Sequence, residues 1–152
     1  MFCDLDSEMF PAITNLSMSL PEFKVGPFDI APVFLVKDVV KSAEYYRDFL
    51  GFRFDRYWGD PPDFVVLQRG GITIMLNSDE RKVKASNPNH RTGVDARWDA
   101  YIRVPSADAI HDEFRTRGVQ IVRAIADAEY GLRDFEVEDL DGYILCIGSD
   151  LP

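Results

Sequence analysis

The side chains best suited to metal or nucleophilic chemistry are few in this chain and lie far apart. Its two cysteines, Cys3 and Cys146, have neither the spacing of metal ligands nor that of a redox pair. His90 lies in a polar stretch, and His111 follows the inward-facing Ile110 on an expected helix, which places its ring toward solvent. Cys146 is either a reactive thiol or a small core residue of an apolar strand. With no Gly-rich phosphate loop either, these residues form no motif that predicts catalysis.

Charge and apolar content narrow the range of partners. The net charge of −9 over 152 residues disfavours nucleic acid, since a phosphate backbone needs a basic face. An acidic surface attracts cationic small molecules, or it only keeps the protein soluble. No apolar run approaches the roughly 20 residues of a membrane span, and residues 1–6 lack the basic head of a secretory signal. We therefore expect a cytoplasmic protein with no membrane partner.

A repeat organises the chain into two similar halves. The run 33–38 leads into an amphipathic stretch that ends at 49–52, and the run 101–106 leads into another that ends at 117–119. In each half a Gly-containing turn then begins a strand, and the offset between the copies stays at about 70 residues. A repeat of this length predicts one domain made of two modules. A ligand is expected where the modules face each other.

The first module, residues 30–79, has the pattern β-α-β-β-β. Asp38 is a good N-cap for a helix whose apolar face is core, and Gly51 is expected to end that helix as a left-handed C-cap. Strands are predicted on either side of the helix because apolar residues alternate and Gly or Pro turns separate them. The predicted strands are 30–36, 52–58, 63–69 and 72–78.

The second module, residues 97–150, repeats this order after a polar linker, residues 80–96. Its helix is expected at 107–117, and its strands are expected at 98–104, 119–124, 132–138 and 143–148. Residues 1–29 precede the repeat and form an N-terminal arm that packs on the domain or on a partner, or else a floppy tail. The fold class is therefore α+β: two βαβββ modules that pair into a curved, half-open barrel with helices outside and a cleft inside.

Three runs of this sequence are similar to the vicinal oxygen chelate superfamily, which comprises glyoxalases, bleomycin-resistance proteins and extradiol dioxygenases. The runs are Pro-Val-Phe-Leu-Val-Lys-Asp-Val at 32–39, Tyr-Tyr-Arg-Asp-Phe-Leu-Gly-Phe at 45–52, and Tyr-Gly-Leu-Arg-Asp-Phe-Glu-Val-Glu-Asp-Leu-Asp-Gly at 130–142. The last run resembles the bleomycin-resistance-like branch most. The resemblance covers residues 30–148 and supports the glyoxalase/bleomycin-resistance fold. Function follows less directly, because one fold hosts many chemistries.

The resemblance assigns four metal-ligand positions to cleft-facing strand residues. In this sequence those positions hold Ala31, Met75, Asp99 and Cys146. Ala and Met offer nothing to a hard divalent ion, so the resemblance implies no metal, no cofactor and no metal-dependent catalysis. The alternative is a metal-dependent lyase or oxygenase that binds its metal through Asp99, Glu136 or another carboxylate outside the usual positions.

Bleomycin-resistance members of the superfamily confer antibiotic resistance by sequestering a drug in a cleft at a homodimer interface. The resemblance thus implies a homodimer that captures an aromatic, neutral or cationic small molecule, with Pro32 where an exchanged N-terminal arm would hinge. Aromatic rings stack on planar or cationic groups, and carboxylates supply negative charge. The candidate ligand-binding residues are Tyr57, Trp58, Phe64, Met75, Trp98, Asp99, Tyr101, Arg103, Tyr130 and Glu136, with Asp55, Asp63 and Asp134 as further sources of negative charge.

Three alternatives stay open for these residues. Each aromatic residue could instead serve core or dimer packing. Arg103 is expected either to pair with Asp99 or to attract an anion. The whole domain could also scaffold a partner protein, which a cleft filled by its own side chains or by the arm would favour.

Overall fold

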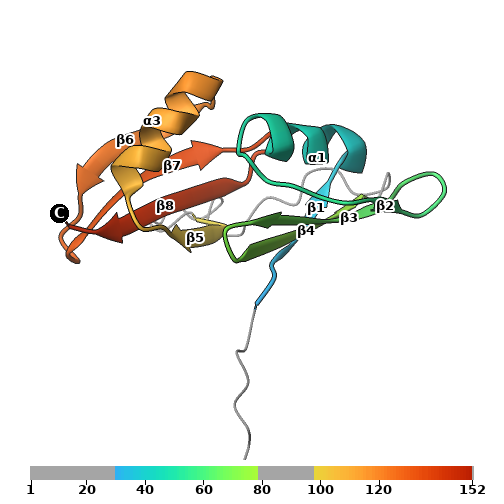
Figure 1. Ribbon diagram of the computed structural model, residues 1–152, viewed down its shortest axis with the longest axis horizontal. Coiled ribbons are helices and arrows are strands. Elements are labelled where there is room, and N and C mark those ends of the chain that lie inside the picture. The colour runs from blue at the N-terminus through green and yellow to red at the C-terminus, as the bar shows by residue number, and fades with distance from the viewer. Residues whose placement is uncertain (1–29, 79–97, 152) are drawn as a thin grey trace, which may run out of the picture.

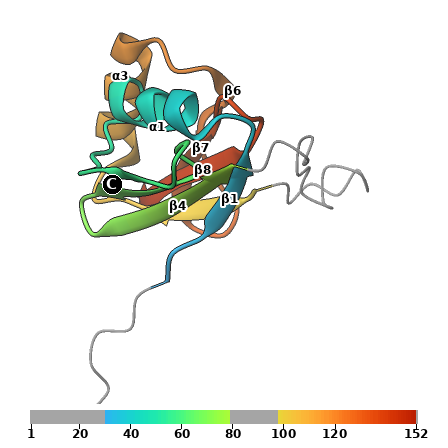
Figure 2. The same cartoon turned by 90° about the vertical axis from the view of Figure 1, so that its right-hand side faces the viewer.

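The computed structural model describes residues 30–78 and 98–151; the N-terminal arm and the linker, residues 80–96, lie outside these ranges. Two four-stranded sheets lie next to each other, and the helices α1 and α3 cover the same side of them (Figures 1 and 2). The first sheet has the strand order β1-β4-β3-β2 and the second β5-β8-β7-β6. In the described part of the chain, neither helix is long and apolar enough to cross a membrane.

Each sheet belongs to one module, and the element order repeats as the sequence predicts. In both modules the first strand pairs in parallel with the last, and the other pairs are antiparallel. The two sheets are not closed into a barrel, so the α+β prediction with two paired modules is confirmed. The elements are β1 (Val33–Val36), α1 (Val39–Asp48), β2 (Tyr57–Trp58), β3 (Phe64–Arg69), β4 (Ile72–Ser78), β5 (Ala100–Arg103), α3 (Ala107–Arg117), β6 (Ile121–Asp127), β7 (Leu132–Glu138) and β8 (Ile144–Asp150).

The ends of the first helix and of the strand after it differ from the prediction. Helix α1 begins after Asp38, whose side chain accepts from the backbone N–H groups of Val40 and Lys41 as expected, but its C-cap is Phe49 and not Gly51. The positive φ of Gly51, +71°, instead turns the chain after the helix. The strand predicted at 52–58 is reduced to two residues, Tyr57–Trp58, and an isolated bridge from Arg53.

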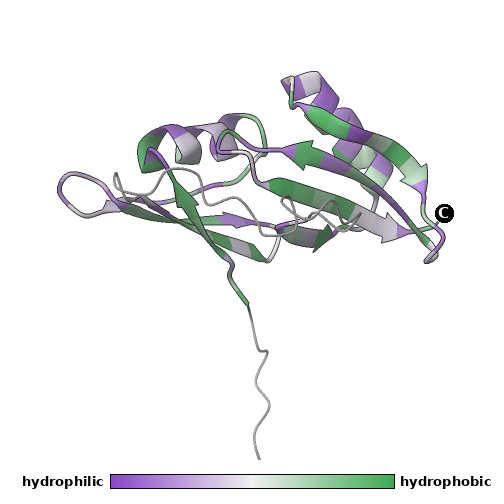
Figure 3. Ribbon diagram, turned by 180° about the vertical axis from the view of Figure 1, so that it is seen from behind, coloured by the Kyte–Doolittle hydropathy of each residue, from purple (hydrophilic) through white to green (hydrophobic). Residues whose placement is uncertain are grey.

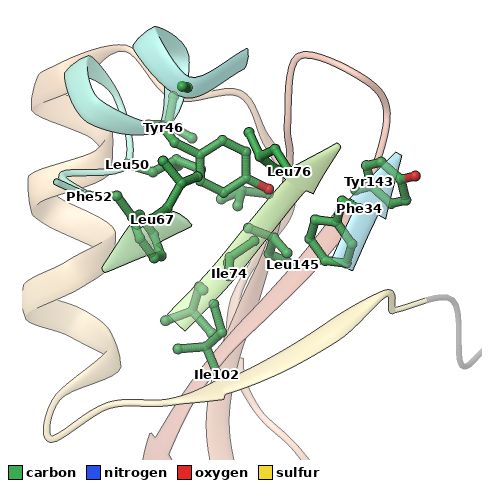
Figure 4. Packing of buried hydrophobic residues seen from close by; sticks show 14 of the residues in the cluster. Phe34, Tyr46, Leu50, Phe52, Leu67, Ile74, Leu76, Ile102, Tyr143 and Leu145 are labelled. Carbon is green, nitrogen blue, oxygen red and sulfur yellow. The ribbon is translucent and has the colours of Figure 1, made fainter. Parts of the chain in front are cut away.

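Strand alternation divides each sheet into a helix-facing side and an opposite side, which we call the open face. The helix-facing side of the first sheet carries the buried residues Phe34, Val36, Ile74 and Leu76. Figure 4 shows Phe34, Ile74 and Leu76 in the buried cluster that also includes Tyr46 of α1. Hydrophobic residues extend along both sheets in Figure 3 and continue this core into the second module. The side chains between them, one residue earlier or later, must point to the open face.

The turn between β7 and β8 holds the modules together at the start of α1. Asp141 accepts a hydrogen bond from the backbone N–H of Lys37 (3.0 Å) and another from the hydroxyl of Ser42. Asp139 accepts from the buried Tyr46 hydroxyl (2.8 Å). Burial raises the pKa of Asp139 to about 6, against the opposing effect of its hydrogen bond from a backbone N–H group.

Tyr143 makes a second connection between the modules. Its ring stacks on Phe34 of β1, with 4.4 Å between ring centroids. Its hydroxyl donates to the carbonyl oxygen of Leu35 (2.8 Å) and accepts from the N–H group of the same residue (3.0 Å). The free side of β1 is therefore fixed by a residue that lies 108 positions later in the chain.

Candidate functional site

A buried carboxylate is the centre of the open face of the second module. The side chain of Asp134, on β7, has no exposed surface. It accepts hydrogen bonds from the hydroxyls of Tyr101 (3.2 Å) and Tyr130 (2.5 Å), and Arg123 approaches it to 2.6 Å. A buried charge is costly unless it is paired and hydrogen-bonded, and here three donors meet that requirement.

A second carboxylate extends the same group of side chains. Glu136, two residues along β7, accepts from the Nε of Arg123 and from the indole N–H of Trp98, both at 2.7 Å. The rings of Trp98 and Tyr101 are also in contact, with 5.2 Å between centroids. We call this group the Asp134 network: Trp98, Tyr101, Arg123, Tyr130, Asp134 and Glu136.

The backbone of β8 makes room for the Asp134 network. Gly148 lies opposite Asp134 in the antiparallel pairing of β7 with β8. A Cβ atom at Gly148 would collide with the hydroxyl of Tyr101 and lie 3.1 Å from the Cβ of Asp134. Glycine in a strand interior often marks such a close approach. The missing side chain therefore allows Tyr101 to reach across the strand to the buried carboxylate.

An irregular strand pairing aims Arg123 at the two carboxylates. Arg123 pairs with Glu136 between β6 and β7, and the register shifts on both sides of it, toward Ile121 and toward Ala126. Such bulges bend a strand and redirect its side chains. Because of these shifts, simple alternation along β6 does not predict which of its side chains meets Asp134.

The contacts within the Asp134 network shift the pKa values of Asp134, Tyr101 and Tyr130. Burial alone would raise the pKa of Asp134, but hydrogen bonds from Tyr130, Arg123 and Tyr101 hold it below its usual value. Burial and the neighbouring Asp134 charge raise the pKa of Tyr101 to about 12 and that of Tyr130 further. The carboxylate therefore stays ionised and the phenols stay protonated near neutral pH.

The open face of the first module is apolar by contrast. Trp58, Phe64 and Met75 lie on it, because Val65, Ile74 and Leu76 beside them point into the core. The rings of Trp58 and Phe64 pack edge to face at 5.6 Å. The guanidinium of Arg56 covers Trp58 at 4.9 Å.

Three predicted residues lie away from both groups. Tyr57 is on the helix-facing side, where its ring packs against Phe54 with 5.0 Å between centroids. Arg103 forms an ion pair with Asp150 at 2.5 Å, so neither the expected pairing with Asp99 nor an open anion site describes it. Asp99 accepts from the backbone N–H of Ile144 (2.8 Å) and so supports the pairing of β5 with β8.

Two hollows among the described residues lie away from both open faces. An apolar cavity of about 30 Å³ lies between the modules, bordered by Phe52 and Phe114 among others, and has room for about one water molecule. A shallow hollow of about 490 Å³ lies at the start of α1, bordered by Lys37 and Asp141 among others. Neither is lined by any of the predicted ligand-binding residues.

The donors at the superfamily's metal positions do not fit a metal ion. Burial and the neighbouring Asp134 charge raise the pKa of the Cys146 thiol to about 12, so it is protonated and a poor ligand. Both oxygens of Asp134 and one oxygen of Glu136 are engaged, and the Arg123 cation lies between these carboxylates. Among the described residues, no three His, Cys, Asp or Glu side chains group as a metal site.

Two residues of the site were not predicted from the sequence. Arg123 lies between apolar residues of β6, and only the shifted register reveals its partners. Gly148 carries a signal that could have been used, since a glycine inside a strand indicates close approach of another group. The sequence did identify Asp134 as a source of negative charge, and Trp98, Tyr101, Tyr130 and Glu136 as ligand-binding candidates.

Comparison with solved structures places this fold among known ones. A bleomycin-binding protein from the bleomycin producer Streptomyces verticillus, complexed with copper(II)-bleomycin, is 25% identical with a TM-score of 0.57, covering 84% of this chain and 98% of that one. TioX from Micromonospora sp. ML1 is 18% identical with a TM-score of 0.59, and the match covers 80% of this chain and 98% of TioX. A glyoxalase/bleomycin resistance protein/dioxygenase from Alicyclobacillus acidocaldarius is 14% identical with a TM-score of 0.66. The match covers 83% of this chain and 93% of that protein.

Sequence comparison agrees at the level of the family. Curated protein sequences give no match to this chain. The model of the glyoxalase/bleomycin resistance protein/dioxygenase superfamily matches residues 30–147, which include both sheets up to β8. The chain therefore belongs to the glyoxalase/bleomycin resistance protein/dioxygenase superfamily.

Proposed function

We propose that the protein binds and sequesters a small aromatic molecule without a metal ion, as in the bleomycin-resistance branch of the superfamily. The observation that carries this proposal is the Asp134 network, in which three aromatic rings surround two carboxylates that an arginine already occupies. Such a surface has stacking groups and hydrogen-bonding groups but no vacant set of metal donors. Binding, and not metal-assisted catalysis, is the chemistry it favours.

The ligand class follows from the side chains of the two open faces. The rings of Trp58 and Phe64 in one module and of Trp98 and Tyr130 in the other suit a planar group, and each stacking contact contributes about 0.5–1.5 kcal/mol. Asp134 and Glu136 carry two negative charges against the single positive charge of Arg123, so a cationic ligand is favoured over an anionic one. The bleomycin complex of the 25% identical protein supports this class.

A homodimer is part of the same proposal. In one chain the open face of the first module leaves Val33 54% exposed and Trp58 37% exposed. A second copy that set its second module against this face would cover these residues and form a cleft lined by both open faces. Drug resistance, a cytoplasmic location and a docking role for residues 1–29 are further parts of the proposal.

Metal content and ligand binding together test the proposal. We expect elemental mass spectrometry of freshly purified protein to find no stoichiometric Mn, Fe, Ni or Zn. Thermal shifts are expected with bleomycin and not with these metals, and the shift should shrink in Trp58→Ala. Leu140→Ala, an exposed residue outside both open faces, is the matched control. One tightly held metal per chain that binding or turnover required would contradict the proposal, and light scattering that found only monomer would contradict its dimeric part.

A further inference from the structure

We propose that Arg123 determines the charge selectivity of the ligand site, acting as a built-in cation on the open face of the second module. This inference rests on the proposed function, because it specifies which ligands that site favours. Arg123 is then a specificity-determining residue whose effect comes from its charge.

The guanidinium of Arg123 is bonded to both carboxylates at once. Its Nη2 lies 2.6 Å from Asp134 and its Nε lies 2.7 Å from Glu136. Charge-assisted hydrogen bonds of this length are strong. One positive charge therefore compensates one of two negative charges, and the three side chains together carry a net charge of about −1.

The remaining oxygens of these carboxylates define what a ligand can still contact. One oxygen of Asp134 takes both tyrosine hydroxyls and the other takes Arg123. Trp98 and Arg123 both donate to the Oε1 atom of Glu136, whereas within residues 30–78 and 98–151 no hydrogen bond is made to Oε2. The Glu136 side chain keeps 17% of its surface exposed. A single carboxylate oxygen thus remains for a ligand cation.

Arg123 is placed where a ligand can sense its charge. Its side chain is 37% exposed, and β6 is the outer strand of its sheet. Arg133 offers a matched comparison, because it also binds two carboxylates, Asp108 (2.9 Å) and Asp127 (2.6 Å). It alternates with Asp134 on β7, so it lies on the helix-facing side. The two arginines have the same type of partners on opposite faces.

Removing the charge of Arg123 should increase the preference for cations. The hydroxyls of Tyr101 and Tyr130 still donate to the Asp134 carboxylate in such a variant and favour its ionised form. The net charge at the three positions then changes from −1 to −2, and an added charge within a few ångströms of a ligand has a substantial Coulomb effect. Arg133→Gln removes an equal charge from the other side of the sheet. Its effect at the open face is expected to be small, because water screens exposed charges.

The test uses two three-ring probes of similar shape and different charge. They are 9-aminoacridine, which is a cation at pH 7, and acridone, which is neutral. The measured quantity is the ratio of the Kd of acridone to the Kd of 9-aminoacridine, obtained by fluorescence titration of the full chain. We expect a ratio above one in the unmodified protein, a further increase of roughly 5- to 30-fold in Arg123→Gln, and little change in Arg133→Gln.

Two further variants keep the test decisive if Arg123→Gln does not fold. Arg123→Gln combined with Asp134→Asn removes one charge of each sign, so the ratio should return to within roughly threefold of the original value. Arg123→Lys keeps the charge but loses the fork that binds both carboxylates, and it should keep the original ratio. Circular dichroism establishes that each variant is folded before its affinities are compared.

The outcomes separate this inference from the proposed function. Binding of both probes with a ratio that Arg123→Gln leaves unchanged would overturn the role of Arg123 and leave the binding function standing. A raised ratio in the charge-compensated double variant, or a loss of selectivity in Arg123→Lys, would also overturn it. If neither probe bound the unmodified protein, both the proposed ligand class and the inference would be wrong.

Discussion

The two modules have the same strand order and helix position, yet their open faces differ in chemistry. The first presents Trp58, Phe64 and Met75, and the second presents a carboxylate network held by Arg123. Their helix-facing sides are similar, since buried hydrophobic residues from both modules form one core cluster there. The repeat therefore preserves the core, while each open face is free to take a different part in ligand recognition.

The largest expected effect comes from removing the centre of the network. Asp134→Ala leaves Arg123 and two tyrosine hydroxyls without their shared partner, and each lost hydrogen bond to a charged group costs about 1.5–3 kcal/mol. Met75→Ala, the control on the apolar open face, should cost only about 1–2 kcal/mol, because its side chain is not fully buried. Urea denaturation measures both free energies of unfolding. Equal losses would mean that the two faces do not differ in how they contribute to stability.

The next largest expected effect on stability depends on pH and comes from Asp139, in the turn that connects the two modules. The pKa of Asp139 is raised to about 6 from an ordinary value of 3.8, so the folded state binds its proton more readily than the unfolded state does. This contribution to stability is complete below pH 3.8 and is lost as the pH rises through about 6. The loss amounts to about 2–3 kcal/mol.

Asp139→Asn tests this effect because it imitates the protonated side chain. We expect the variant to gain stability relative to the unmodified protein at pH 7.5 and to match it at pH 4, with urea denaturation at each pH as the measurement. Subtracting the two curves removes the contributions of other carboxylates, including Asp134, whose pKa is lowered. A pH-independent difference between the two proteins would show that folding does not raise the pKa of Asp139.

A smaller expected loss of stability concerns Gly148, which leaves space for Tyr101 on the open face of the second module. Gly148→Ala places a Cβ against the Tyr101 hydroxyl, and overpacking of this type costs about 1–3 kcal/mol. In a Tyr101→Ala background the same substitution should cost much less, because the group it strikes is gone. The double-mutant cycle is measured by urea denaturation. Additive losses would indicate that Gly148 matters for the strand alone and not for the approach of Tyr101.

The sequence predicts the architecture well because apolar alternation and the repeat both report on the core. It predicts the site less completely, because the site depends on strand register. Tyr57 and Trp58 show one error that alternation could have prevented, since adjacent strand residues point to opposite faces and cannot both line one cleft. The contacts of Arg123 could not be predicted from the sequence. They depend on two register shifts in β6 that no residue type in that strand indicates.

The smallest expected change in stability is that of Trp58→Ala on the apolar open face. Measuring stability and ligand affinity on this variant distinguishes a packing role from a binding role. Trp58 is 37% exposed and lies on the outer two-residue strand β2, so Trp58→Ala should lower the free energy of unfolding by only about 0.5–1 kcal/mol. The same change should weaken binding of 9-aminoacridine about tenfold, because one stacking face is lost. Urea denaturation and fluorescence titration on the same sample measure the two effects. A large loss of stability with unchanged affinity would assign Trp58 to packing and would leave the second module as the ligand-contacting half, because its polar network supplies rings and charge together.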